Sequence, residues 1–93
     1  MTKFAVEITT PDKPYAKISA EMVVAPGSEG QFAVMKDHIS FLTSLKKGFI
    51  RISDGNKTLD KIGIKSGILK FENNLCLILI DEILEHHEIK EAE

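Results

Sequence analysis

Hydrophobic and polar residues alternate with a period of two along most of this 93-residue chain. Such alternation is typical of β-strands that bury one face and expose the other. It predicts strands over residues 4–9, 15–20, 22–25, 31–34, 39–45, 48–53, 59–64, 68–71 and 75–80, and residues 82–85 could extend the sheet. The apolar spacing of residues 39–45 also fits a helix. We favour a strand there because Ile39 and Phe41 are β-prone and the flanks are rich in turn residues.

Residues that favour turns separate these predicted strands. They are grouped at residues 11–14, 26–27, 54–56, 66–67 and 72–74. The Asp54-Gly55 pair between two β-prone runs is a strong hairpin signal. Many short strands with frequent turns predict an all-β fold, a roughly ten-stranded β-sandwich or flattened barrel. We expect one domain over residues 1–85, followed by a polar tail, 86–93, that frays.

The run Leu75–Ile80 is apolar at every position and is therefore predicted to be a central strand packed on both sides. At six residues it is also the longest apolar run in the chain. A membrane-spanning helix needs about 20 apolar residues, so we expect no direct membrane insertion. We expect no signal peptide at Met1, because no apolar stretch of the required length follows it.

The formal net charge is −2, which provides no basic surface for nucleic acid or for an anionic membrane. The single cysteine, Cys76, excludes an internal disulfide and suits a reducing compartment. Because Cys76 lies within an apolar run, we interpret it as an inert core thiol. The sequence shows no nucleophile–base set and no phosphate-binding loop, so we expect no catalytic residues and no cofactor.

Residues 25–34 contain more turn-forming residues than a simple connection between two strands needs. Gly27 and Gly30 allow unusual backbone angles and the close approach of another chain. Between and beside them, Ser28, Glu29 and Gln31 would project from a narrow tip. The residues alone leave two interpretations open, a polar contact with a partner or an ordinary solvated turn.

A histidine and a short apolar segment follow this tip. No neighbouring Ser or Cys pattern makes His38 catalytic. On a strand, Phe41 and Thr43 would share one face while Leu42 takes the other. The second face would then leave an apolar patch of the kind that marks an interface, unless both faces are buried.

The adjacent His86 and His87, with Glu85 and Glu88, could suggest a metal site. Adjacent residues on a strand point to opposite faces, so they cannot easily share one ion. We therefore expect no metal here and interpret the segment as part of a solvated tail.

Several separated motifs, in the same order, resemble the N-terminal β-sandwich domain of the epsilon subunit of F-type ATP synthases. The resemblance covers about residues 3–85. It rests on Val6-Glu7-Ile8 with Thr10-Pro11, on residues 23–30, on His38, on residues 42–46 with Gly48, on residues 50–52, on residues 66–69 and on residues 79–81.

The resemblance implies a non-catalytic, ten-stranded sandwich at the foot of the rotary central stalk. One face would pack on the gamma subunit, and one end would rest on the loops of the membrane c-ring and transmit torque. The implied c-ring contacts are Ser28, Glu29, Gly30, Gln31 and His38, and the implied gamma contacts are His38, Phe41, Leu42 and Thr43. The implied location is peripheral, on the cytoplasmic side of the inner membrane, or on the matrix or stromal side in an organelle.

Three features depart from the family pattern. Gln31 replaces a usual glutamate, and Lys36-Asp37 replaces a usual Pro-Gly. The sequence stops where the family continues into a helical hairpin that can inhibit ATP hydrolysis, so we expect coupling without self-inhibition. A nucleotide-binding motif found in some members would begin near Ile89, but Lys90 replaces its Asp, so we expect no ATP binding. The alternative is a free-standing β-sandwich that binds other proteins.

Overall fold

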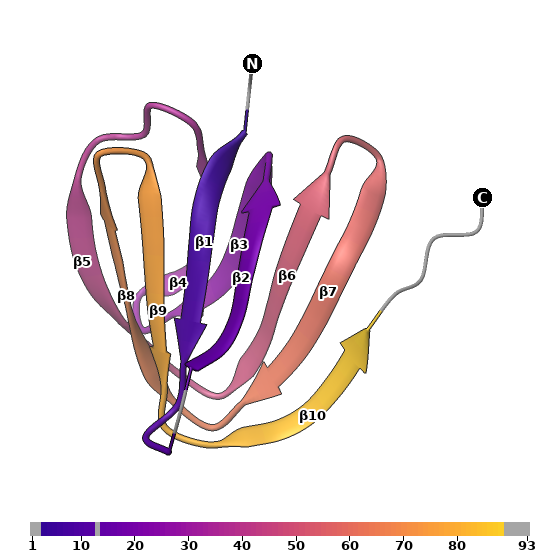
Figure 1. Ribbon diagram of the computed structural model, residues 1–93. Coiled ribbons are helices and arrows are strands. Elements are labelled where there is room, and N and C mark those ends of the chain that lie inside the picture. Colours follow the sequence, from indigo (N-terminus) through magenta and orange to yellow (C-terminus); the bar gives the residue numbers. More distant parts are fainter. Residues whose placement is uncertain (1–2, 13, 89–93) are drawn as a thin grey trace.

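The computed structural model describes residues 3–12 and 14–88, and its regular elements there are all β-strands (Figure 1). The ten strands are β1 Phe4–Thr9, β2 Pro14–Ala20, β3 Met22–Gly27, β4 Gly30–Met35, β5 Phe41–Leu45, β6 Gly48–Asp54, β7 Lys57–Ile64, β8 Gly67–Glu72, β9 Leu75–Ile80 and β10 Ile83–Glu88. The all-β class predicted from the alternating pattern is therefore confirmed.

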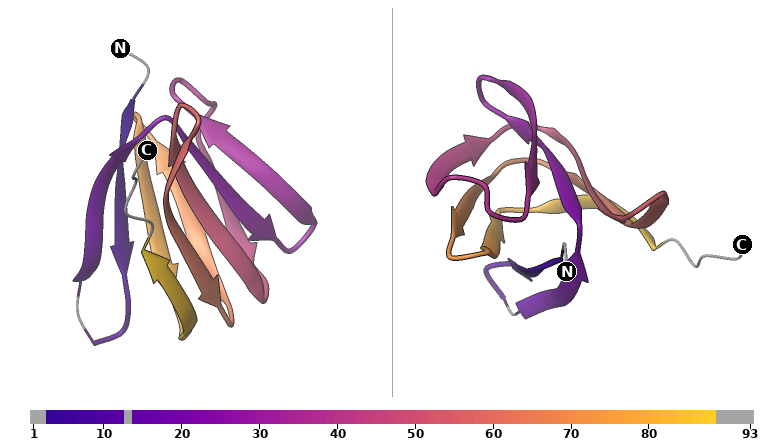
Figure 2. Two further views of the ribbon diagram at one scale, coloured as in Figure 1. Left: turned by 90° about the vertical axis from the view of Figure 1, so that its right-hand side faces the viewer. Right: turned by 90° about the horizontal axis from the view of Figure 1, so that it is seen from above.

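The strands form one curled sheet in the order β10-β7-β6-β3-β5-β8-β9-β1-β2, and β4 lies off this path, paired with the whole length of β3. All pairs are antiparallel except β1 with β9. One half of the sheet consists of β10, β7, β6, β3 and β4, and the other half consists of β5, β8, β9, β1 and β2. The two halves join through a single register pair, Gly27 with Leu45. The sheet folds back over itself, as the two views of Figure 2 show.

The core lies inside this curl and takes alternate residues from almost every strand. Two aromatic rings, Phe4 and Phe71, meet edge to face with their centroids 5.4 Å apart. The largest fully buried side chains are Phe71, Ile8, Ile50, Ile52, Ile62, Ile64, Leu69, Ile78, Ile80, Val6, Val23 and Val34. β-branched residues dominate this set, as expected for strands that pack face to face.

Several predicted strand boundaries differ from the structure, and two of them change the interpretation. The strand expected from residue 39 begins only at Phe41, where pairing with β8 starts, and Ile39 is 78% exposed. The tail predicted from residue 86 is wrong for residues 86–88, which belong to β10. The reason is that backbone pairing with β7 continues to Glu88 opposite Asp60, whatever the polarity of the side chains. Residues 89–93, including Ile89 and Lys90, lie outside the described residues.

Strand β9 is central, as predicted, because it pairs with β8 on one side and β1 on the other. The prediction that it packs on both faces is wrong. Its outward residues are only partly covered, and Leu79 is 44% exposed. No layer among the described residues covers the convex side of this part of the sheet. In the same residues, no helix is long and apolar enough to cross a membrane.

Candidate interaction surfaces

The β3–β4 turn is a narrow tip, as the glycine spacing predicted. Gly30 has a φ of 130°, which side-chain-bearing residues rarely adopt. A Cβ on Gly27 would lie 2.8 Å from the carbonyl oxygen of Gly30, so this position requires glycine. The Ser28 amide donates to the Ser44 carbonyl at 3.0 Å, which ties the tip to β5. The side chains of Ser28, Glu29 and Gln31 remain exposed for a polar contact.

The structure does not bring His38 to this tip. Strand β4 runs from Gly30 to Met35 and separates the two by about 17–20 Å, at about 3.3 Å per residue. His38 lies in the connection between β4 and β5. This connection is at the end of the molecule opposite to the tip (Figure 1). The predicted c-ring set is therefore split between two ends, and only residues 28–31 form one site.

The three candidate residues of strand β5, Phe41, Leu42 and Thr43, point to alternating faces of the sheet, as strand geometry requires. Phe41 and Thr43 are half-buried and face inward, where the Phe41 ring meets that of Phe32 at 5.5 Å. Leu42 faces outward and is 67% exposed. Of the residues predicted to contact gamma, only His38 and Leu42 present their side chains to the surface.

A larger apolar surface surrounds Leu42, which we call the β5–β8–β9 outer face. It comprises the apolar outward residues of these strands, Leu42, Ile68, Leu75, Leu77 and Leu79. The register places Ile68 beside Leu79, and it places Lys70 between Leu42 and Leu77. Ile68 and Leu79 are each 44% exposed. Sequence reasoning missed this face because it assigned both sides of Leu75–Ile80 to the interior.

A groove of about 520 Å³ continues this face towards the end that carries the tip. Its lining is largely apolar and includes Thr9, Pro11, Leu45, Ile68, Leu79 and Ile80. Contiguous apolar surface with a concave margin is typical of a protein–protein contact. The face and the tip therefore form two distinct candidate contacts on one half of the molecule.

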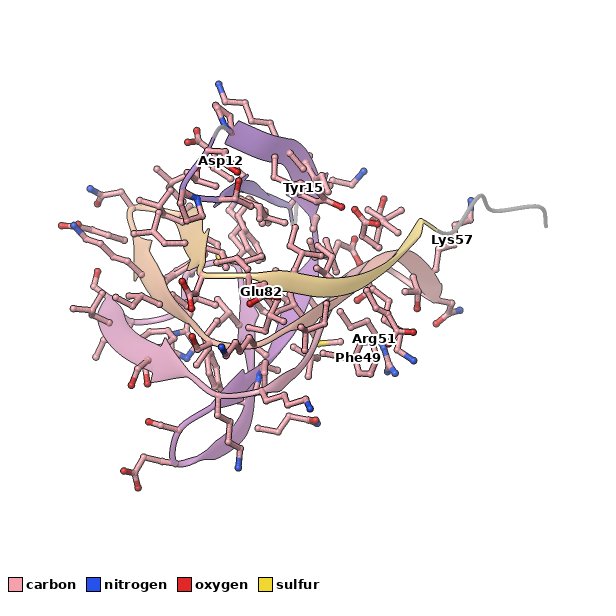
Figure 3. The ribbon with its side chains drawn as sticks, turned by 90° about the horizontal axis from the view of Figure 1, so that it is seen from below. Asp12, Tyr15, Phe49, Arg51, Lys57 and Glu82 are labelled. Atoms are coloured by element: carbon pink, nitrogen blue, oxygen red, sulfur yellow. The ribbon has the colours of Figure 1, made fainter. Side chains whose placement is uncertain are left out.

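A second exposed surface lies on β6 and β7. The Phe49 ring is 41% exposed, and the Lys61 ammonium nitrogen sits 4.6 Å from its centroid. Gly63 leaves room for this ring, because a Cβ there would lie 3.1 Å from the Phe49 edge. Figure 3 shows Phe49 and Arg51 next to each other on the outside of the sheet. The adjacent cations make this surface more polar than the β5–β8–β9 outer face.

Cys76 is fully buried in the core, as the sequence predicted. Burial removes water from the thiolate and raises the pKa of the thiol from 9.0 to about 12, so the side chain stays neutral and unreactive. Among the residues that the structure describes, no three His, Cys, Asp or Glu side chains are grouped to hold a metal ion.

The raised pKa of Cys76 predicts a loss of stability at alkaline pH. The unfolded thiol loses its proton above its ordinary pKa of 9.0, whereas the folded thiol keeps it up to about 12. The unfolded state then binds fewer protons, so the free energy of unfolding falls as pH rises. We expect a loss of about 2 kcal/mol between pH 8 and 10.5 from this group. Urea denaturation across this range measures it.

The control for this prediction is Cys76→Ala, which lacks the titrating group. This variant is less stable throughout, but its free energy of unfolding should fall by about 2 kcal/mol less over the same pH range. Parallel pH curves for the two proteins would contradict the assignment.

The sequence of this domain matches a known protein family. A family model described as "ATP synthase, Delta/Epsilon chain, beta-sandwich domain" matches residues 3–86, and the chain belongs to this family. The ATP synthase epsilon chain of Campylobacter curvus is 40% identical over 87% of this chain and 63% of its own length. That of Chlorobium limicola is 32% identical over 86% of this chain and 91% of its own length. The chain therefore spans less than two thirds of the Campylobacter relative.

A solved structure shares the fold. A chain in the central stalk/c-ring structure of the Tetrahymena thermophila mitochondrial ATP synthase superposes with a TM-score of 0.72. The match covers 87% of this chain and 65% of that chain, at 18% sequence identity. The predicted β-sandwich and the family resemblance are both confirmed by these comparisons.

Proposed function

We propose that this chain is a non-catalytic central-stalk subunit of a proton-translocating F-type ATP synthase. It links the gamma subunit to the c-ring and so couples proton flow to ATP synthesis. The observation that carries this proposal is the bare β5–β8–β9 outer face on a domain of the epsilon family. An exposed apolar face costs solubility in a monomer, whereas a subunit that is permanently assembled covers it.

The β5–β8–β9 outer face is the proposed contact with gamma. Fully burying an aliphatic side chain contributes about 1.5–3 kcal/mol, and Leu42, Ile68 and Leu79 each retain much of that surface in the isolated chain. Charged residues lie among and beside them, with Lys70 between Leu42 and Leu77 and Glu72 opposite Leu75. An apolar centre with charged neighbours is the usual composition of a stable protein interface.

The tip is the proposed contact with the c-ring, through Ser28, Glu29, Gly30 and Gln31. The exposed amide of Gln31 offers neutral hydrogen bonds, which contribute about 1 kcal/mol each, against about 1.5–3 kcal/mol where one group is charged. Such a contact depends less on salt than one made by a carboxylate. His38 is assigned to the gamma side alone, because β4 separates it from the tip.

The proposed location follows from these partners. A subunit held between gamma and the c-ring is peripheral, on the cytoplasmic side of the membrane or on the matrix or stromal side in an organelle. We expect it to bind no nucleotide and no cofactor. The alternative, a free-standing β-sandwich that binds other proteins, predicts a monomer that binds neither gamma nor the ring.

The test replaces both central residues of the face, in the variant Ile68→Asp with Leu79→Asp. Two carboxylates placed in an apolar interface should weaken binding to the gamma subunit of the same organism about 100-fold or more. Isothermal titration calorimetry measures this loss, and circular dichroism checks that the variant is folded.

The matched control is Leu84→Asp, on β10 in the other half of the sheet. Leu84 is 47% exposed, so its solvent exposure matches that of the tested residues. This variant should bind gamma as the unaltered chain does. Failure of the unaltered chain to bind gamma, or equal binding by the double variant, would overturn the proposed function.

A further inference from the structure

The connection between β4 and β5 is fastened to the β8–β9 turn by a reciprocal pair of hydrogen bonds. The Asp37 amide donates to Asn74 Oδ1 at 2.7 Å, and Asn74 Nδ2 donates to Asp37 Oδ1 at 3.1 Å. The two residues are 37 positions apart in the sequence. Both connections lie at the same end of the molecule in Figure 1. The pair joins two surface connections that are far apart in the sequence.

Both residues of the pair also hold an uncommon backbone conformation. Asp37 has a φ of 67° and Asn74 a φ of 57°. Non-glycine residues adopt this left-handed region rarely, and Asn and Asp are the ones that tolerate it best. The Asn74 carbonyl also accepts a bond from the Ala5 amide at 3.3 Å, so the turn is itself anchored to β1.

The side chain of His38, which follows Asp37 in the chain, is held in place by contacts within the molecule. Its ring lies 4.9 Å from that of Phe41 and 5.9 Å from that of Phe71. Its Nδ1 donates to the Ile39 carbonyl oxygen at 2.7 Å, because a carbonyl only accepts. Its backbone amide donates to the Met35 carbonyl at 3.1 Å. The imidazole therefore orients the backbone of Ile39.

These contacts present Ile39 to solvent. Its side chain is 78% exposed, the highest value among the large hydrophobic residues of the described chain, and Leu42 on the following strand is 67% exposed. An apolar side chain on a loop already held in place loses little conformational entropy when a partner covers it. Rigid apolar side chains of this kind carry a large share of the affinity at interfaces.

We propose that Ile39 is an anchor of the contact with the gamma subunit, and that Asp37, His38 and Asn74 are positioning residues that hold it ready. This inference rests on the proposed function: Ile39 lies in the connection that leads into β5, three residues before Leu42 of the β5–β8–β9 outer face. The family resemblance implied a gamma contact through His38, Phe41, Leu42 and Thr43, and this proposal adds Ile39 and gives His38 a positioning role.

The anchor is tested by Ile39→Ala. This change should weaken binding to the gamma subunit about tenfold without changing the melting temperature, because the side chain is exposed. The matched control is Met35→Ala. Met35 is 57% exposed and lies just before the loop, but it sits on β4 in the other half of the sheet. Equal affinity of Ile39→Ala and the unaltered chain would overturn the anchor role.

The positioning role is tested by Asn74→Gly, which removes both side-chain bonds and tolerates the left-handed backbone. The amides of residues 36–40 should exchange with deuterium about tenfold faster, and the affinity for gamma should fall about fivefold. The control Asn73→Gly changes a residue of the same turn with a φ of 53° whose side chain is not part of the pair. It should change neither quantity.

A conservative variant separates positioning from charge. Asp37→Asn keeps an oxygen that accepts from Asn74 Nδ2, so loop exchange and affinity should both stay near their original values. Faster loop exchange in Asn74→Gly with unchanged affinity would overturn the positioning role while leaving the proposed function intact. Failure of the unaltered chain to bind gamma would overturn the proposed function, and this inference with it.

Discussion

Replacing Phe71 by Ala should lower the free energy of unfolding by about 3–5 kcal/mol. Phe71 is 1% exposed, and its ring packs edge to face on that of Phe4 at 5.4 Å. Truncation removes this buried surface and leaves a cavity between strands that cannot close over it, because their backbones are paired. In a domain of this size, each kcal/mol lowers the melting temperature by about 4–8 °C. Urea and thermal denaturation measure both quantities.

Two further variants serve as comparisons for the loss of stability expected of Phe71→Ala. Phe71→Leu keeps most of the volume and should cost less than about 1.5 kcal/mol. Phe49→Ala removes the same side chain from a site that is 41% exposed and should cost clearly less than Phe71→Ala. A loss below about 1.5 kcal/mol for Phe71→Ala would contradict the placement of this ring at the centre of the core.

The effect of Phe71→Ala should extend to the candidate interface. The ring of His38 lies 5.9 Å from that of Phe71 on the surface side of the core. Loss of the phenyl ring removes one of the two aromatic groups against which the imidazole packs. One core residue therefore supports both the stability of the sandwich and the fixed position of the β4–β5 connection.

The strands could be predicted from the sequence because their signals are local. A period of two and nearby turn residues fix each strand independently of the rest of the fold. The Asp54-Gly55 pair, for example, predicted a hairpin, and β6 and β7 pair there as antiparallel neighbours with Gly55 at a φ of 67°. The tip at residues 28–31 was found for the same reason, since Gly27 and Gly30 are both required by its geometry.

The features that could not be predicted depend on contacts between distant segments. The exposure of Leu79 follows from which strands flank β9 and from the absence of a covering layer among the described residues. The Asp37–Asn74 pair joins two loops that only the completed sandwich brings together. The family resemblance grouped His38 with the tip, whereas an extended strand carries the two to opposite ends.

Replacing Gly67 by Ala should destabilise the domain by about 2–4 kcal/mol. A Cβ at this position would lie 2.5 Å from the carbonyl oxygen of Leu79 and 3.4 Å from the Ile80 Cα. Both atoms belong to the backbone, so neither can move aside without separating β8 from β9, which pair there as Gly67 with Ile80. Thermal denaturation followed by circular dichroism measures the loss.

The control is Gly63→Ala, where the added Cβ meets a side chain instead. It would lie 3.1 Å from the edge of the Phe49 ring, which is 41% exposed and has room to turn outward. We expect a loss of less than about 1.5 kcal/mol for this variant. Equal losses for the two variants would show that β8 and β9 separate easily at this end.

Gly67→Ala should also weaken binding to gamma by more than its effect on stability alone explains. Ile68 and Leu79 are direct register partners at the centre of the β5–β8–β9 outer face. Ile68 follows Gly67 in the chain, and Leu79 carries the carbonyl oxygen that the new Cβ would displace. The close approach of the two strands therefore sets the spacing of the apolar face. Gly63→Ala leaves that half of the sheet unchanged and should leave the affinity for gamma unchanged.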